Sequence, residues 1–132
     1  MGTEDDAFLK AFEAATIPNG AFHHRDHIRL SWIYLRRLGR EAGTRQILDG
    51  IRAFAAVHGA QRLYHETITR AWIHLVAGRL EEDPGGESFE DFVTAHPDLL
   101  QKTYLHTFFT AGLLGSEKAR ACWVEPDRCP LP

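Results

Sequence analysis

The stretch "FHHRDHIRLSW", residues 22–32, places three of the chain's eight histidines within five positions. Imidazole nitrogen is a common ligand of Zn, Fe and Ni, so a histidine cluster is a candidate metal site. A helix that begins near residue 24 puts His24 and His27 about 60° apart, on the side that continues into an apolar stripe. We therefore expect His24 and His27 to point inward and His23 to face the loop or solvent.

A second inward histidine is predicted in "YHETITRAW", residues 64–72, at the start of a later helix. If short loops join the helices, consecutive helices are antiparallel, and the helices that begin near residues 24 and 62 are parallel. Their N-terminal ends then lie at one end of the bundle. We predict that His24, His27 and His65 converge on one divalent metal ion, with a position left for water.

Further site residues follow from this arrangement. Glu66 is the candidate catalytic base that would activate metal-bound water, and Asp26 and Glu66 could orient the imidazole rings. Arg25, Thr69 and His106 are the candidate ligand-binding residues. The pattern thus predicts a metal site that acts on a small molecule, with catalysis itself left open.

Two alternatives use the same residues differently. Helix N-termini carry partial positive charge, so the histidine end could instead be a non-enzymatic pocket for a carboxylate or phosphate. In the other, the histidines cap a polar core layer of a helical homodimer. Its contact surface would be formed by apolar residues that we expect to be exposed, namely Phe108, Phe109, Leu113 and Leu114.

Helical spacing of apolar residues predicts an all-α fold over residues 1–132, and strand-like alternation is missing from the sequence. The expected helices run from Thr3 to before Pro18, from 24 to 38 with a stop at Gly39, from 43 or 44 to 58, from 62 to 80, from 89 to 95, through 97–109, and from 116 to 122. The prediction is one compact bundle of four main helices, with short C-terminal helices and an extended, proline-rich tail.

Composition narrows the classes of function. A net charge of −3 with mixed acidic and basic residues lacks the basic footprint of a nucleic-acid-binding domain. Apolar runs are far shorter than the roughly 20 residues that cross a bilayer, and the N-terminus is acidic. Cys122 and Cys129 have no metal-site or secretory context, so we expect reduced thiols in a cytoplasmic protein.

The segments "FHHRDHIRLSWIYLRR", "YHETITRAW" and "ARACWVEPDRCPLP" resemble a family of small all-α bacterial proteins of unassigned function. The shared patterns are F-x-H-x-x-H and Y-H-x-T-x-T, and they match Phe22, His24, His27, Tyr64, His65, Thr67 and Thr69. This resemblance implies no activity. In architecture the chain is also similar to DinB-like metal-binding four-helix bundles, whose close histidine pair is instead H-x-x-x-H on a late helix.

Overall fold

The computed structural model describes residues 3–84, 86 and 88–132, and every regular element in that part of the chain is a helix. The predicted all-α class is therefore confirmed. The chain divides into two compact units, residues 1–64 and 65–132. A single domain over residues 1–132 stays a prediction. Among the described helices, none has the length and apolar character needed to cross a membrane.

The N-terminal unit begins with α1 (Thr3–Glu13), as predicted. Ala15 ends this helix in a left-handed conformation with φ of 56°. The Thr16 N–H reaches back to the Ala11 carbonyl at 2.9 Å, which is the pattern of a Schellman stop. Glycine usually occupies this position because a Cβ is unfavourable there. A short 3-10 helix, η1 (Asn19–Ala21), then leads into α2.

Helix α2 (His24–Val57) is interrupted at Gly39, where φ of 84° and ψ of 175° are non-helical. The predicted break at Gly39 is confirmed. The second segment begins at residue 40 rather than 43 or 44, because one glycine reverses the chain without a loop. We call residues 24–38 the first arm and residues 40–57 the second arm. A short 3-10 helix, η2 (Gln61–Leu63), follows the second arm.

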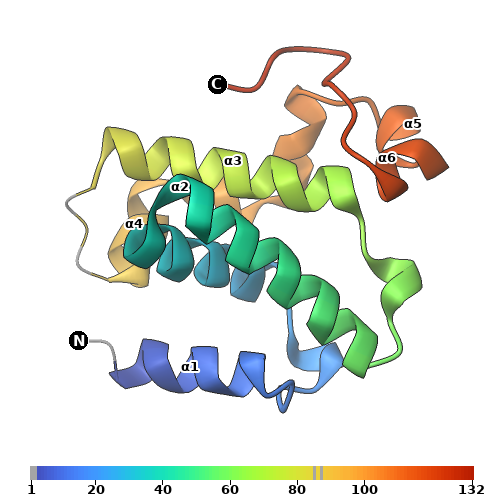
Figure 1. Cartoon of the computed structure of the whole chain (residues 1–132). Coiled ribbons are helices and arrows are strands. Elements are labelled where there is room, and N and C mark those ends of the chain that lie inside the picture. Colours follow the sequence, from blue (N-terminus) through green and yellow to red (C-terminus); the bar gives the residue numbers. More distant parts are fainter. Residues whose placement is uncertain (1–2, 85, 87) are drawn as a thin grey trace. The chain divides into compact units, whose positions relative to one another are not determined.

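The two arms fold back against each other (Figure 1). A Cβ atom added to Gly43 would lie 3.0 Å from both the Leu35 Cα and the Tyr34 carbonyl oxygen. The arms therefore touch backbone to backbone at this glycine. Three aromatic rings then join α1, the following loop and the second arm. The ring centroids of Phe12 and Phe54 lie 5.3 Å apart, and that of Phe22 lies 5.4 Å from Phe12 and 4.9 Å from Phe54.

The C-terminal unit contains α3 (Glu66–Glu82), α4 (Phe89–Ala95), η3 (Pro97–Leu100), η4 (Lys102–Thr107), α5 (Ala111–Leu114) and α6 (Glu117–Ala121). The predicted start of α3 at residue 62 is wrong, because His65 is extended with φ of −131° and ψ of 109°. The predicted helix through 97–109 is also wrong and is replaced by the two 3-10 helices. Ser88 and Ser116 cap α4 and α6 as expected.

Side-chain hydrogen bonds connect the helices of this unit. The Arg79 guanidinium donates two hydrogen bonds to Asp98, at 2.9 and 2.7 Å, and one to the Tyr104 hydroxyl at 3.1 Å. These bonds from Arg79 keep the pKa of Asp98 below its usual range. The buried Thr67 hydroxyl donates to the Cys122 carbonyl at 2.8 Å and accepts the Val124 N–H at 3.1 Å. Helix α3 is thereby tied both to η3 and η4 and to the start of the tail.

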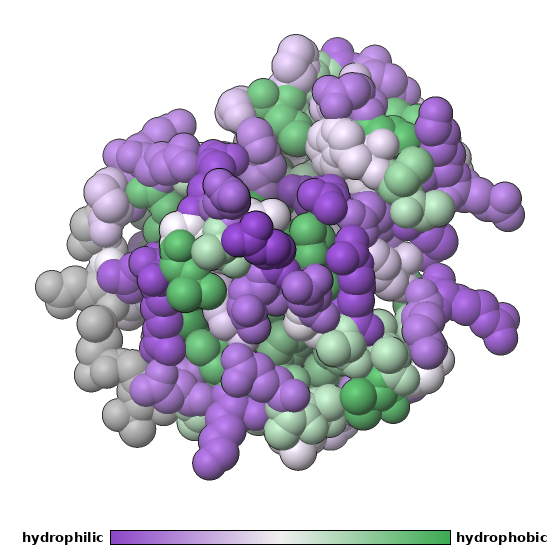
Figure 2. Space-filling model, in the orientation of Figure 1, coloured by the Kyte–Doolittle hydropathy of each residue, from purple (hydrophilic) through white to green (hydrophobic). Residues whose placement is uncertain are grey.

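Hydrophilic residues cover most of the face seen in Figure 2, and hydrophobic residues show in separate areas. Three of the four residues predicted to form an exposed dimer contact are not exposed, and the fourth, Leu113, is half-buried. Phe108, Phe109 and Leu114 are buried, with exposed fractions of 4%, 0% and 9%. Phe108 packs edge-on against Tyr104, and its carbonyl accepts the Arg128 N–H at 2.9 Å. Homodimerisation itself stays a prediction.

We predict that Gly43→Ala lowers the free energy of unfolding by about 1–3 kcal/mol, because the new methyl would collide with backbone atoms of the first arm. Gly78→Ala is the matched control, since a Cβ there meets no atom within 4 Å. Because Gly78 lies in the interior of a helix, the control substitution should raise the free energy of unfolding by about 0.5–1 kcal/mol. Urea unfolding of both variants gives the comparison. Equal stabilisation of both would contradict the close approach of the two arms.

Candidate functional site

The histidines at the start of α2 differ in their exposure to solvent. His23 is exposed and is the N-cap residue of α2, and its backbone N–H donates to the Asp26 carboxylate at 2.9 Å. The expectation that His23 faces outward is confirmed. Asp26 therefore caps the helix, and its role in orienting the histidine rings stays a prediction. His24 and His27 are half-buried.

The His27 ring packs edge-on against Phe22, with the ring centroids 4.5 Å apart. Phe22 in turn contacts Phe12 and Phe54. At the far end of the second arm, the ring of His58 lies 4.5 Å from Phe54. Two histidines thus extend the aromatic cluster of the N-terminal unit, which gives the Phe22-to-His27 spacing a structural role.

His65 is buried in the C-terminal unit and uses both ring nitrogens. Nδ1 accepts the Ile68 N–H at 3.1 Å, so His65 acts as the N-cap of α3. Because Nδ1 is an acceptor, the neutral ring carries its proton on Nε2, which donates to the Leu114 carbonyl at 2.6 Å. A metal ion at either nitrogen would replace one of these bonds.

The other predicted site residues of this unit have structural partners. The Glu66 carboxylate is buried and pairs with Arg70 one helical turn later. The Thr69 hydroxyl donates to the His65 carbonyl at 2.7 Å. His106 is exposed on η4, and Arg25 in the N-terminal unit is exposed on the first turn of α2. Roles of Glu66 as catalytic base and of Arg25, Thr69 and His106 as ligand-binding residues stay predictions.

Neither unit, within the described residues, contains a group of three or more His, Cys, Asp or Glu side chains that could hold a metal ion. The convergence of His24, His27 and His65 stays a prediction. No protein-family model, curated protein or solved structure matches the chain. The likeness to the bacterial family and to DinB-like bundles therefore stays a resemblance in motifs and architecture.

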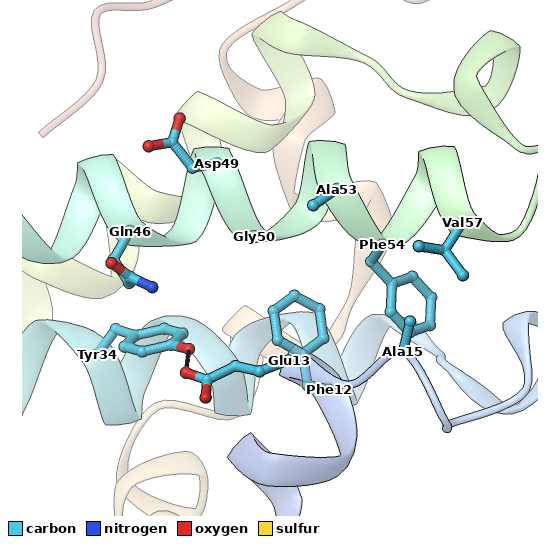
Figure 3. Close-up of a pocket in the computed structure, with 10 residues that line it drawn as sticks. All are labelled: Phe12, Glu13, Ala15, Tyr34, Gln46, Asp49, Gly50, Ala53, Phe54 and Val57. Atoms are coloured by element: carbon cyan, nitrogen blue, oxygen red, sulfur yellow. Dashed lines mark hydrogen bonds between the residues drawn. The ribbon is translucent and has the colours of Figure 1, made fainter.

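A cavity of about 270 Å³ lies in the N-terminal unit, between the end of α1 and the second arm of α2 (Figure 3). Its volume is just below the range of roughly 300–1,000 Å³ that is usual for small-molecule sites. The lining residues are Phe12, Glu13, Ala15, Tyr34, Gln46, Asp49, Gly50, Ala53, Phe54 and Val57. Two rings of the aromatic cluster therefore form part of the cavity wall.

The lining has a polar end and an apolar end. In Figure 3 the Glu13 carboxylate meets the Tyr34 hydroxyl near Gln46, whereas Phe54, Ala15 and Val57 lie at the other end. Tyr34 donates to Glu13 Oε2 at 2.5 Å. An apolar wall with a few converging polar groups is the usual composition of a small-molecule site.

Tyr34 is held as a hydrogen-bond donor by its surroundings. Burial raises the pKa of the Tyr34 hydroxyl well above its usual range, and the hydrogen bond to Glu13 and the charge of Glu13 raise it further. A hydrogen bond from Gln46 and the charge of Arg37 act in the opposite direction and are weaker. A tyrosine that acts as a general base needs a pKa near the working pH. The shift at Tyr34 therefore favours a binding role over a catalytic one.

Ala15 is the one described non-glycine residue with positive φ, and it lines the cavity. Alanine in this conformation costs roughly 1–2 kcal/mol, which glycine would avoid. Retained backbone strain is concentrated at functional sites and is an argument for function at the place where it is observed. The methyl group of Ala15 gives the cavity part of its apolar end.

No motif in the sequence marks this cavity. Glu13 is an ordinary polar residue near the end of α1, and Tyr34 lies outside the inward face predicted for residues 24–38, which is Ile28, Ser31, Trp32, Leu35 and Leu38. The one available signal is in "EAATIPNG", residues 13–20, where a helix ends without a glycine at its stop. That signal predicts a left-handed non-glycine residue, but it does not reveal which residues lie around it.

We predict that Ala15→Gly raises the free energy of unfolding by about 0.5–1 kcal/mol, because glycine adopts positive φ without strain. The control is Ala7→Gly, an exposed position inside α1, which should lose about 1 kcal/mol from helix propensity. Chemical unfolding of both variants provides the comparison. A loss at Ala15 equal to that at Ala7 would contradict the strained stop.

The two bonds of His65 lead to a further prediction. His65→Ala should lower the free energy of unfolding by about 2–3 kcal/mol, because it removes an N-cap and leaves the buried Leu114 carbonyl unpaired. His65→Asn should recover about 1 kcal/mol, since asparagine is a good N-cap. Thermal unfolding with and without a chelator distinguishes this role from metal binding. A melting temperature that chelator lowers in the unmutated protein, and leaves unchanged in His65→Ala, would instead favour the metal site.

Proposed function

We propose that the protein binds a small molecule with an apolar body in the cavity of the N-terminal unit. The observation that carries the proposal is the cavity itself. It is an open cavity that has the Glu13–Tyr34 pair at its polar end and apolar side chains at its other end. The strained Ala15 supports it independently, since the residue costs stability and contributes to the cavity wall. Binding without chemistry agrees with the upward pKa shift of Tyr34.

The rigidity of the wall also supports binding. Phe12 stacks on both Phe54 and Phe22, and Phe54 packs at a tilt against Phe22, so their rings are fixed by packing before any ligand arrives. Gly50 lets α1 approach the second arm, because a Cβ there would lie 2.8 Å from the Phe12 ring. A preformed cavity loses less conformational entropy on binding than a flexible one.

A pair of alanines on the second arm allows a matched test. Ala53 and Ala56 are both exposed, and only Ala53 lines the cavity. We expect Ala53→Phe to fill the cavity and weaken binding at least about tenfold, whereas Ala56→Phe should bind as the unmutated protein does. The probes are 2-phenylethylamine, 2-phenylethanol and phenylacetate, followed through the backbone amide signals of Gly50 and Ala53 in NMR titrations.

The proposal makes the NMR outcome specific. At least one probe should shift the cavity amides saturably, and the shift should be lost in Ala53→Phe. If no probe shifts these amides at millimolar concentration, the proposed function is wrong. Equal binding by the Ala53→Phe and Ala56→Phe variants would also contradict it, because the ligand would then occupy another place.

A further inference from the structure

We propose that the ligand of this cavity is an organic cation, with a primary ammonium group at Glu13 and an apolar body that extends toward Val57. This inference rests on the proposed function and adds the chemical class of the ligand. Its basis is the charge and hydrogen-bonding capacity of the residues at the polar end.

The lining is acidic. Of its ten residues, Glu13 and Asp49 carry carboxylates, and no lysine, arginine or histidine is present. Asp49 points away from the Glu13–Tyr34 pair in Figure 3, and it lies 3.8 Å from Arg52. Glu13 is therefore the carboxylate that faces a ligand. The charge of Arg37 lowers the pKa of Tyr34, and Arg37 is itself paired with Asp6 at 2.8 Å.

Glu13 has hydrogen-bonding capacity to spare. Oε2 accepts the Tyr34 hydroxyl, while Oε1 has no hydrogen-bond or ion-pair partner among the described residues. Glu13 is exposed, and the Tyr34 bond restrains its carboxylate through Oε2, so Oε1 is open to a second donor. A carboxylate accepts and cannot donate, so the complementary ligand group is a donor, and a charge-assisted bond from an ammonium is the strongest available.

The apolar end of the cavity does not suit a small inorganic cation. Phe54, Ala53 and Val57 offer no oxygen ligands, whereas hard cations need six or more oxygens. These side chains would instead cover the apolar surface of a bound ligand. A molecule with an ammonium at one end and an apolar chain or ring at the other matches both ends at once.

The experiment compares 2-phenylethylamine with its neutral and anionic counterparts, 2-phenylethanol and phenylacetate, by the same NMR titration. We expect the amine to bind about tenfold more tightly than the alcohol, and phenylacetate to bind most weakly. Glu13→Gln keeps an acceptor for Tyr34 and removes the charge. It should lower the affinity for the amine about tenfold and leave the affinity for the alcohol unchanged. Glu41→Gln, whose side chain is 92% exposed, is the matched control and should bind all three as the unmutated protein does.

The outcomes separate the two proposals. If the alcohol or phenylacetate binds as tightly as the amine, or Glu13→Gln keeps the preference for the amine, the cation inference is overturned while the cavity remains a binding site. If none of the three binds, both proposals are overturned. Retained binding of the alcohol by Glu13→Gln also shows that this variant is folded.

Discussion

The N-terminal unit depends on the packing of three phenylalanine rings from three separate segments. Phe12 comes from α1, Phe22 from the loop before α2, and Phe54 from the second arm, with ring centroids 4.9–5.4 Å apart. Aromatic pairs at such distances contribute roughly 0.5–1.5 kcal/mol beyond the burial of their surface. The chain reaches this arrangement through unusual backbone at two points, the left-handed Ala15 and the reversal at Gly39. The cavity is formed on one side of the same cluster.

Much of the fold could be predicted because its signals are local. The stop at Gly39 and the caps at Ser88 and Ser116 each depend on one residue type and its immediate neighbours, and all three predictions are confirmed. The failures involve distant partners. His65 is taken out of the helix because its ring bonds to Leu114, 49 positions later. The spacing of apolar residues within 62–80 carries no information about that contact. The 3-10 helices after Pro97 were not predicted for the same reason.

The candidate site shows the same division. The histidine-rich stretch suggests a metal site because of its residue types, yet two of its contacts have structural roles: His27 packs on Phe22, and the His23 N–H donates to Asp26. Glu13 and Tyr34 are common residue types without a motif, 21 positions apart, and they gain meaning only through the hydrogen bond between them. A charged group held by a buried neighbour beside an apolar wall is a property of the folded chain.

A structure of the protein with 2-phenylethylamine bound tests the central claim most directly. The account predicts the ammonium nitrogen within hydrogen-bond distance, about 2.7–3.2 Å, of Glu13 Oε1. It also predicts the phenyl ring against Phe54 and Val57, with the Glu13–Tyr34 bond intact. An amine bound outside this cavity, or one whose nitrogen points to solvent with its ring beside Glu13, would contradict the account.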